Sequence, residues 1–562
     1  MSSSNNRPWL DNYPKGVPAE IDMEEFPSIV ALLENCFTRF EHRPAFSNMG
    51  RTISYGELEQ LSRQFASFLV NDLKCEKGDR IAMMLPNVLQ YPIAICGALR
   101  AGMVVVNTNP MYTARELRHQ LEDSGAKAIL VLDNFAHTVS EVIKETPVKH
   151  VITSGLGDML GFPKSLITNF VVRHVKKMVP PFSIDGAIRF KDALGRGKGK
   201  TLPKADVATS DIAFLQYTGG TTGVAKGAML THRNMIANMQ QASAWISGGM
   251  TEGEEVIVTA LPLYHIFALT ANCLTFMKIG GLNHLITNPR DMPGFVAELG
   301  RTRYTSITGV NTLFNGLLNT PGFDQLDFSN LRMTLGGGMA VQRSVAERWQ
   351  KVTGSTLAEA YGLTETSPAV CINPLGITEY NGSIGLPIPS TEVNIQSDSG
   401  QILPVGEIGE LCVRGPQVMK GYWNREEETA KIIDADGWLH TGDIARMDEN
   451  GFFYIVDRKK DMILVSGFNV YPNEIEDVVA SMPGILEVAA IGVPDEKSGE
   501  VVKLVIVRKD PAITESAVRA HCRKELTGYK QPKIIEFRES LPKTNVGKIL
   551  RRELRDAPVA PS

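Results

Sequence analysis

The chain has 562 residues, of which 43% are hydrophobic and 21% charged, and its formal net charge at pH 7 is -4. This length exceeds what one hydrophobic core supports, so at least two domains are expected. The charge balance disfavours nucleic-acid binding, and seven dispersed cysteines without a Cys-x-x-Cys pair disfavour a disulfide framework or a zinc site.

In the first half of the chain, short apolar runs alternate with helical patterns. Residues 80–84, 128–131 and 256–260 are typical of buried strands, whereas residues 58–69 and 113–121 have helical spacing. This alternation predicts βαβ units and mostly parallel sheets.

Residues 164–179 (KSLITNFVVRHVKKMV) predict an amphipathic helix that ends at two prolines. One arc carries Arg173, Lys176 and Lys177. Such a helix lies at a membrane surface or packs its apolar face on the protein's own core, and both interpretations stay open. The opposite, apolar arc holds Ile167, Phe170, Val171, Val175 and Met178. Residues 195–200 (GRGKGK) predict a flexible basic loop.

The last third of the chain changes character twice. Short strands with Gly and Pro turns predict a β-rich region over residues 384–421. After a polar interruption at residues 457–461, residues 462–508 and 534–552 predict a smaller mixed domain. We therefore place a hinge near Lys460.

The most specific segment is residues 217–227 (YTGGTTGVAKG), after an apolar strand and before a helical stretch. Its glycines let backbone N–H groups converge on an anion, and a lysine adds positive charge. It is not a Walker A loop, because Ala225 precedes the lysine and no Ser or Thr follows it. The alternative is a plain Gly/Thr turn. The predicted phosphate cradle comprises Tyr217, Thr218, Gly219, Gly220, Thr221, Thr222, Gly223 and Lys226.

This loop resembles the phosphate-binding signature of the AMP-forming acyl-CoA synthetase superfamily. It departs from that signature at Ala225, where the family usually has Pro, and at Gly219, where it often has Ser or Thr. Further segments that resemble family motifs occur in the family's order, and the resemblance runs from about residue 46 to residue 552. These segments are 261–267 (LPLYHIF), 336–340 (GGGMA), 361–366 (YGLTET), 436–444 (DGWLHTGDI) with 457–460 (DRKK), and 543–549 (KTNVGKI). The DGWLHTGDI run resembles fatty acyl-CoA synthetases, closest to the bacterial long-chain enzymes.

The resemblance implies an α/β fold in two domains. Residues 1–459 would form a large N-terminal domain with βαβ-type sheets and a distorted β-barrel, which binds ATP and the acyl group. Residues 460–562 would form a small mobile α+β domain that carries a catalytic lysine loop. The implied reaction joins a medium- or long-chain fatty acid to ATP, giving acyl-AMP and pyrophosphate, and then transfers the acyl group to coenzyme A. Mg²⁺ is the implied metal cofactor.

Adenylate formation brings two anions together, so neutralising charge dominates the barrier. Glu365 is a hard oxygen ligand suited to Mg²⁺, and the resemblance adds Thr218 as its partner. Lys548, after Gly547 in the last motif, would reach both the carboxylate and the α-phosphate. His265 would gate the passage between the acyl and thiol sites, or it is an ordinary core histidine. The resemblance thus implies Lys548, His265, Thr218 and Glu365 as catalytic residues.

Other residues would bind the nucleotide and coenzyme A. Tyr361 can stack on adenine, Asp443 can accept both ribose hydroxyls, and Arg458 offers a rigid fork of donors. The further residues that the resemblance implies are Gly336, Gly337 and Gly338 beside the adenine, Gly362 and Thr364 in the adenine and magnesium motif, Lys460 at the hinge and Gly467 beside the pantetheine.

Three alternatives remain. An amino-acid adenylation domain is disfavoured, because no Asp or Glu lies between Leu261 and Phe276 to pair a substrate ammonium. An acyl-AMP ligase that loads a carrier protein stays open. A non-catalytic nucleotide or lipid binder is disfavoured by the retained Lys226, Glu365, Asp443 and Lys548.

No apolar run of about 18 residues predicts a spanning helix. We expect a cytoplasmic protein, with peripheral contact to the cytoplasmic face of the inner membrane through residues 164–179 as an alternative. No nucleic-acid partner is expected, and oligomerisation is left open.

Overall fold

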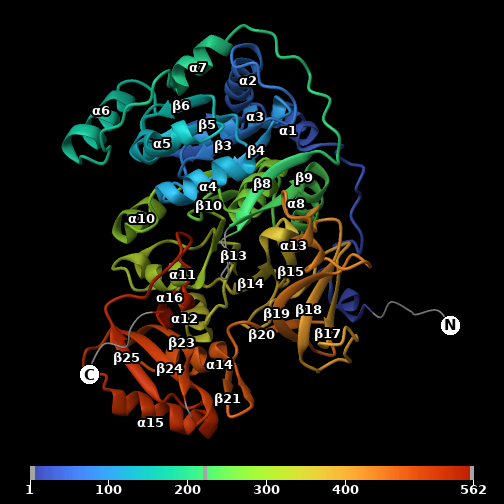
Figure 1. Ribbon diagram of the computed structural model, residues 1–562, viewed down its shortest axis with the longest axis vertical. Coiled ribbons are helices and arrows are strands. Elements are labelled where there is room, and N and C mark those ends of the chain that lie inside the picture. The colour runs from blue at the N-terminus through green and yellow to red at the C-terminus, as the bar shows by residue number, and fades with distance from the viewer. Residues whose placement is uncertain (1–6, 219–224, 496, 557–562) are drawn as a thin grey trace, which may run out of the picture.

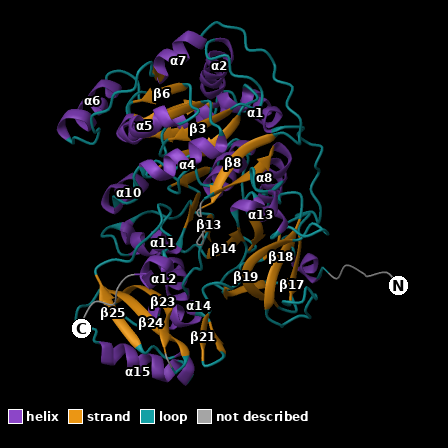
Figure 2. Ribbon diagram, viewed as in Figure 1, coloured by secondary structure: helices purple, strands orange, loops and turns teal. Residues whose placement is uncertain are grey.

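The structure is a computed structural model that describes residues 7–218, 225–495 and 497–556. Figure 1 shows an elongated molecule, with the N-terminal sheets and helices at one end and the small C-terminal unit at the other. The mixed α/β fold predicted from the sequence is confirmed. The strands of the described residues all lie in four sheets, and helices lie against them (Figure 2).

The first sheet is built from the predicted βαβ units. Its strand order is β7–β6–β5–β3–β4–β8–β9, and neighbouring strands are parallel except for the antiparallel pair β8 and β9. All five residues of β5 are buried, as its continuous apolar run predicts. Its strands are β3 (Arg80–Met84), β4 (Val104–Asn107), β5 (Ala128–Leu132), β6 (His150–Ser154), β7 (Ile188–Arg189), β8 (Ile212–Thr218) and β9 (Lys226–Thr231).

The second sheet has the order β16–β15–β14–β13–β12–β10–β11–β1–β2 and is parallel through its centre. The loops after β13 and β14 leave the same edge, since both strands run in the same direction. Its strands are β1 (Pro44–Asn48), β2 (Arg51–Ser54), β10 (Val256–Thr259), β11 (Leu282–Leu285), β12 (Ser306–Gly309), β13 (Met333–Gly337), β14 (Leu357–Gly362), β15 (Ala369–Ile372) and β16 (Leu386–Pro387).

The predicted β-rich region, residues 384–421, supplies β17 and β18 to an antiparallel sheet, whose other two strands lie beyond it. The sequence resemblance implies a distorted barrel here. Among the described residues the hydrogen-bonded order is β17–β18–β19–β20, and β17 does not pair with β20 to close it. β20 ends at Arg458 and the next strand begins at Ile463, so the predicted hinge lies in the connection between two sheets. The strands are β17 (Glu392–Gln396), β18 (Gly409–Arg414), β19 (Leu439–Met447) and β20 (Phe453–Arg458).

The small C-terminal unit has its own core. Ile475 and Val479 of α14 pack with Leu504 and Ile506 of β24 and Val518 of α15, and all five side chains are buried. This mixed composition matches the predicted α+β domain. The strands are β21 (Ile463–Val465), β22 (Phe468–Val470), β23 (Ile485–Asp495), β24 (Gly499–Arg508) and β25 (Ile534–Arg538).

Capping residues mark the start of several helices. Thr113 caps α4, because its hydroxyl accepts the Glu116 N–H while the Glu116 carboxylate accepts the Thr113 N–H. Thr231 and Asn234 form the same arrangement at α8. The α-helices are α1 (Ile29–Arg39), α2 (Tyr55–Asn71), α3 (Gln90–Arg100), α4 (Ala114–Ser124), α5 (Ala136–Val142), α6 (Lys164–Phe170), α7 (Phe190–Gly197), α8 (His232–Ile246), α9 (Thr275–Lys278), α10 (Met292–Leu299), α11 (Asn311–Leu318), α12 (Arg343–Thr353), α13 (Glu426–Ala430), α14 (Pro472–Ala480), α15 (Glu515–Glu525) and α16 (Arg551–Asp556).

The helix predicted at residues 164–179 begins where expected, as α6, and continues as a π-helix, η4 (Val171–Val175). Most of its apolar arc does not pack on a core of the described chain, because Ile167, Phe170 and Val175 are each about 60% exposed, although the neighbouring Val172 is buried. The core-packing interpretation of this helix is therefore wrong. Across the described residues, no helix is both long and apolar enough to cross a membrane.

The prediction of a flexible loop at residues 195–200 is also wrong for its first half, since helix α7 extends to Gly197. A Cβ on Gly197 would stand 1.8 Å from the Gln64 carbonyl oxygen of α2. Glycine here serves the close packing of two helices rather than a flexible turn, which composition alone does not distinguish.

Candidate active site

Side chains from three strands meet in a hydrogen-bonded group, the Asp443 cluster, made of Tyr361, Asp443 and Arg458. The Tyr361 hydroxyl donates to Asp443 Oδ2 at 2.6 Å, and Arg458 Nε lies 3.0 Å from Asp443 Oδ1. Asp443 is 2% exposed, and its negative charge is the main cause that raises the pKa of Arg458. Two donors thus hold a buried carboxylate in a fixed orientation.

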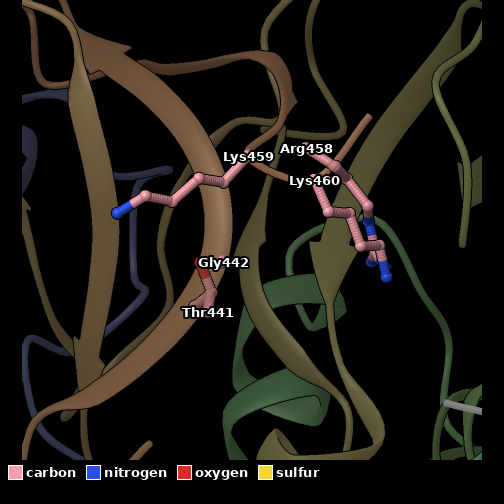
Figure 3. A pocket seen from close by; sticks show the side chains of 5 residues that line it. All are labelled: Thr441, Gly442, Arg458, Lys459 and Lys460. Atoms are coloured by element: carbon pink, nitrogen blue, oxygen red, sulfur yellow. The ribbon is translucent and has the colours of Figure 1, made fainter. Parts of the chain in front are cut away.

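A hollow of about 290 Å³ adjoins this cluster and is lined by Thr441, Gly442, Arg458, Lys459 and Lys460 (Figure 3). Arg458 and Lys460 point in the same direction, whereas Lys459 points away from them. Lys459 Nζ instead lies 2.7 Å from Asp398 Oδ1 in the large domain. The predicted hinge residue and the cluster therefore share one hollow.

Lys548 approaches the cluster from the small domain. It follows Gly547, which has φ 86°, in a tight turn where the Thr544 N–H donates to the Lys548 carbonyl at 2.7 Å. The Gly547 carbonyl accepts a hydrogen bond from Thr312 Oγ1 of α11 at 2.9 Å. This contact docks the lysine loop on the large domain.

The ammonium of Lys548 lies among other cations. Burial, followed by the positive charge of Arg458, lowers the pKa of Lys548 to about 8, although Asp443 opposes the shift. Lys460 and Arg551 add to the lowering. Such a group has a strong tendency to bind an anion, because a carboxylate or phosphate would relieve the repulsion.

His265 lies in the segment between β10 and η5 (Ala268–Leu274), where the neighbouring Leu263 and Ile266 are buried. Its Nδ1 accepts the Phe267 N–H at 3.3 Å. Burial, and then the charge of Lys548, lower the pKa of His265 to about 4. The imidazole is therefore neutral at pH 7 and close enough to Lys548 to sense its charge.

The described ends of the predicted phosphate cradle lie on two antiparallel strands, β8 and β9, and helix α8 follows only after β9. Thr218 ends β8 and lies opposite Lys226, the first residue of β9. The Tyr217 hydroxyl donates to Asp123 Oδ2 at 2.7 Å. Five cradle residues lie outside the described part of the chain, namely Gly219, Gly220, Thr221, Thr222 and Gly223.

Beside these two strands lies a second group, the Lys226 group, made of Lys226, Glu365, Tyr422 and Glu428. The Tyr422 hydroxyl donates to Glu365 Oε1 at 2.6 Å, and Lys226 Nζ stands 5.2 Å from the centre of the Tyr422 ring. Lys226 also pairs with Glu428, whose pKa falls to about 2 because it bonds to Lys226 and Lys431. The lysine predicted to bind phosphate thus has a carboxylate partner.

Glu365 and Thr218 suit a magnesium ion whose remaining ligands are phosphate oxygens and water molecules. Glu365 lies in the short helix η7 (Thr364–Thr366), which β9 contacts, and it offers a carboxylate near the Thr218 end of the strand pair. Within the described ranges, no group of three or more His, Cys, Asp or Glu could hold a metal ion. One carboxylate with a hydroxyl fits Mg²⁺, which usually takes few protein ligands beside substrate phosphates.

Glycines bring the backbone of β13 and β14 close together at the predicted adenine loop. A Cβ on Gly337 would stand 2.9 Å from the Ala360 carbonyl oxygen, and one on Gly362 would stand 1.8 Å from that of Pro368. Gly336 precedes them in β13, and Gly338 has φ 76° just after its end. These contacts hold the predicted loop beside Tyr361, with Thr364 opening η7 next to it.

Gly467 is the one predicted residue in the β21–β22 turn, with φ 85°. Nothing stands within 4 Å of the position that a Cβ would take there. The structure thus brings Tyr361, Asp443, Arg458, Lys460 and Lys548 together and leaves Gly467 in a separate, open turn.

Four residues of this region escaped the sequence analysis. Tyr422 and Glu428 contact Glu365 and Lys226 from the segment after β18, and Asp123 holds both Tyr217 and Arg425. Arg551 follows Lys548 by three residues and carries ion pairs of its own. Asp123 and Tyr422 lie far in sequence from the motifs that they support, so no spacing signals them.

Comparison with protein-family models gives two matches. Residues 33–423 match the family described as AMP-binding enzyme, and residues 474–548 match its C-terminal domain. The site residues named above that lie outside these two segments are Arg425, Glu428, Lys431, Thr441, Gly442, Asp443, Arg458, Lys459, Lys460, Gly467 and Arg551.

Curated relatives and solved structures agree with these matches. The chain is 59% identical over 548 residues to the long-chain-fatty-acid–CoA ligase of Salmonella typhimurium, with 98% of both chains covered. It is 58% identical to the protein of the same name from Escherichia coli O6:H1, at the same coverage. The crystal structure of ATP-bound MatB from Rhodopseudomonas palustris is similar with a TM-score of 0.80 and 28% identity, and covers 94% of this chain and 98% of its own.

Proposed function

This chain belongs to the AMP-binding enzyme family, and on that premise we propose that it is an ATP-dependent long-chain fatty acid–CoA ligase. The fatty acid carboxylate attacks the α-phosphate of ATP and releases pyrophosphate, and coenzyme A then displaces AMP from the acyl-adenylate. The observation that carries this proposal is the similarity to ligases of that name along 98% of the chain. Lys548 beside Asp443 supports it, because an ammonium is needed where two anions meet.

In the first half-reaction, the Asp443 cluster orients the nucleotide. The Asp443 carboxylate accepts from the ribose hydroxyls while Tyr361 and Arg458 keep it in place. Lys548 donates to the attacking carboxylate and the α-phosphate, and Lys226 exchanges Glu428 for the leaving phosphates. Gly336, Gly337 and Gly338 leave room for the adenine, and Tyr361 stacks on it.

Glu365 and Thr218 would hold Mg²⁺, which supplies positive charge to the phosphates when bound. The Glu365 carboxylate is oriented for this role by the Tyr422 hydroxyl. Thr218 contributes a hydroxyl from the end of β8. The glycines and threonines of residues 219–223 complete the phosphate contacts in this proposal.

The second half-reaction requires coenzyme A to reach the adenylate. We assign residues 1–459 to a large domain and residues 460–562 to a small domain that rotates about Lys460. Rotation withdraws Lys548 and brings in the β21–β22 turn, where the open space at Gly467 admits the pantetheine. His265, which stays neutral, closes the passage between the acyl and thiol sites until then.

The exposed helix α6 suits a peripheral contact with a membrane. Its exposed apolar side chains, together with Phe162 at 86% exposure, form an apolar patch of the kind that contacts membranes or other proteins. Lys176 and Lys177 flank the patch, whereas Arg173 pairs with the buried Asp133 at 2.9 Å and serves the fold. The helix lies at the end of the molecule opposite the small domain (Figure 1), so a membrane there leaves the hinge free. The apolar patch comprises Phe162, Leu166, Ile167, Phe170, Val175 and Met178.

Co-sedimentation with vesicles tests this contact. The double variant Ile167→Ser, Phe170→Ser should bind anionic phosphatidylglycerol vesicles less than the parent, and Lys176→Glu with Lys177→Glu should weaken binding only at low salt. Ile402→Ser with Val405→Ser is a matched control, because it removes two exposed apolar side chains elsewhere. Equal binding by the α6 variant and this control would contradict the contact.

The proposed activity is tested by ATP–pyrophosphate exchange across fatty acids of graded length. Exchange should need a fatty acid and not coenzyme A, and should be fastest with long chains. Thioester should then form with coenzyme A. Transfer only to a carrier protein would favour the carrier-loading alternative, and no exchange with any fatty acid would favour a non-catalytic binder.

A further inference from the structure

A largely buried group of charged and polar side chains, in which only Asp457 is fully buried, spans the connection between the two domains, and we call it the hinge cluster. It consists of Asp457, Asp461, Asn473, Glu476 and Arg551. Asp457 lies in β20 of the large domain, one residue before its end, whereas the other four belong to the small domain. The cluster therefore joins the two sides of the residues about which the small domain would rotate.

The guanidinium of Arg551 is the centre of this cluster. Its Nη2 donates to Glu476 Oε2 and to Asn473 Oδ1, each at 2.7 Å, and its Nε donates to Glu476 Oε1 at 3.0 Å. Its Nη1 lies 3.4 Å from Asp461 Oδ2 and 3.5 Å from Asp457 Oδ1. Three segments, namely β20, the connection after it and α14, thus meet on one planar group, which a flexible lysine could not match.

Asp457 is fully buried, and its Oδ1 accepts the backbone N–H of Arg458 in the same strand at 2.7 Å, while its other partners come from the small domain. Its Oδ2 accepts the backbone N–H of Asn473 at 2.9 Å, at the start of α14, and its Oδ1 faces Arg551. Burial raises the pKa of Asp457 to about 6, although Arg551 and the Asn473 N–H oppose the shift. A buried carboxylate is stable only while such partners remain.

We propose that Asp457 and Arg551 form a lock across the hinge that holds the small domain in the orientation with Lys548 beside Asp443, and that Arg551 is a positioning residue for Lys548. This inference rests on the proposed function. Arg551 opens α16 only three residues after Lys548, so fixing one restricts the other.

The two halves of the cluster differ in what rotation does to them. The bonds of Arg551 to Glu476 and Asn473 lie within the small domain and survive any rigid rotation. The contacts of Asp457 with Asn473 and Arg551 cross the hinge and must break. Asp457 therefore carries the dependence on orientation, while Glu476 keeps the arginine ready to reform the lock.

Asp457→Asn tests this division, because it keeps the shape of the side chain and removes its charge. Pyrophosphate exchange should fall about tenfold relative to thioester formation from presynthesised acyl-adenylate, the scale of one charge-assisted hydrogen bond. Glu474→Gln is the matched control. Glu474 lies on α14, as Asn473 and Glu476 do, but the ion pair with Lys530 that it loses lies wholly within the small domain. Its ratio of the two rates should stay at the parent's value, whereas an equal fall of both rates in Asp457→Asn would overturn the lock.

Arg551→Lys provides a second variant that keeps the charge and loses the fork, and it should shift the same ratio in the same direction. A distance measurement separates this inference from the proposed function. Spin labels at Lys351→Cys in the large domain and Arg523→Cys in the small one should report one main distance without any substrate. Asp457→Asn should add a second distance, and an unchanged distribution would overturn the lock even if the enzyme is active.

Discussion

The Asp443 cluster and the Lys226 group lie at two ends of one site, yet they differ in how their charges are satisfied. Asp443 is buried and held by hydrogen-bonding contacts with Tyr361 and Arg458. Lys226 pairs with Glu428, a solvent-facing carboxylate that a phosphate must displace. In the proposed mechanism, one end is therefore organised in advance, which would favour catalysis, whereas the other would exchange partners as pyrophosphate arrives and leaves.

Removing the cation at the organised end should have the largest effect. Lys548→Ala should reduce adenylate formation by about 10³-fold, the scale for losing one group that stabilises developing charge. Thioester formation from presynthesised acyl-adenylate should continue, because Lys548 serves only the first step. Pyrophosphate exchange and thioester assays on the same folded variant check this, and equal loss of both steps would refute the assignment.

Neutralising the metal ligand should have the next largest effect. Glu365→Gln keeps the hydrogen bond from Tyr422 but removes the charge, so we expect about 2 kcal/mol less transition-state stabilisation. The rate should recover partly at high Mg²⁺. A magnesium titration that matches the parent's would show that Glu365 is not the ligand.

The lowered pKa of Lys548 predicts how activity depends on pH. The pKa of Lys548 is lowered to about 8, so its ammonium is lost at a lower pH than usual. The kcat/KM for ATP should therefore fall about tenfold per pH unit above this value. With ATP bound, its negative charge stabilises the ammonium, so kcat should fall only at higher pH.

Lys548→Arg is the control for this profile, because a guanidinium keeps its charge throughout the range. Its residual activity should show no fall near pH 8. If the variant and the parent share one profile, another group is responsible for the titration.

The smallest effect is expected for Glu428, the carboxylate that pairs with Lys226. Glu428→Gln removes the competitor of the phosphates for Lys226, so the KM for ATP should fall by a few-fold with little change in kcat. A rise in this KM would mean that Glu428 orients Lys226 for ATP instead of competing with it.

Much of the fold was predictable, because buried parallel strands carry continuous apolar runs. Residues 80–84 and 128–131 fall within β3 and β5, and Thr113 marks the start of α4. Composition misled at Gly197, where glycine allows two helices to touch. The exposure of the apolar face of α6 was not predictable either, since an amphipathic pattern does not say what covers it.

At the site, residues inside contiguous motifs were predictable from the sequence, and the structure brings several of them together. The residues that hold them were not. Tyr422, Glu428 and Asp123 act through contacts between distant segments, and Asp457, although it lies in the DRKK segment, received no role of its own in the sequence analysis. Such partnerships depend on how strands and domains pack, which local spacing does not record.

Oxygen-isotope transfer tests the central claim most directly, because it follows the atom that attacks phosphorus. The enzyme would turn over a long-chain fatty acid labelled with oxygen-18 in both carboxylate positions, with ATP and coenzyme A, and the AMP would be analysed by mass spectrometry. Attack of the carboxylate on the α-phosphate predicts one labelled oxygen in each AMP released. AMP without label, or label in inorganic phosphate with ADP as the product, would contradict an acyl-adenylate route.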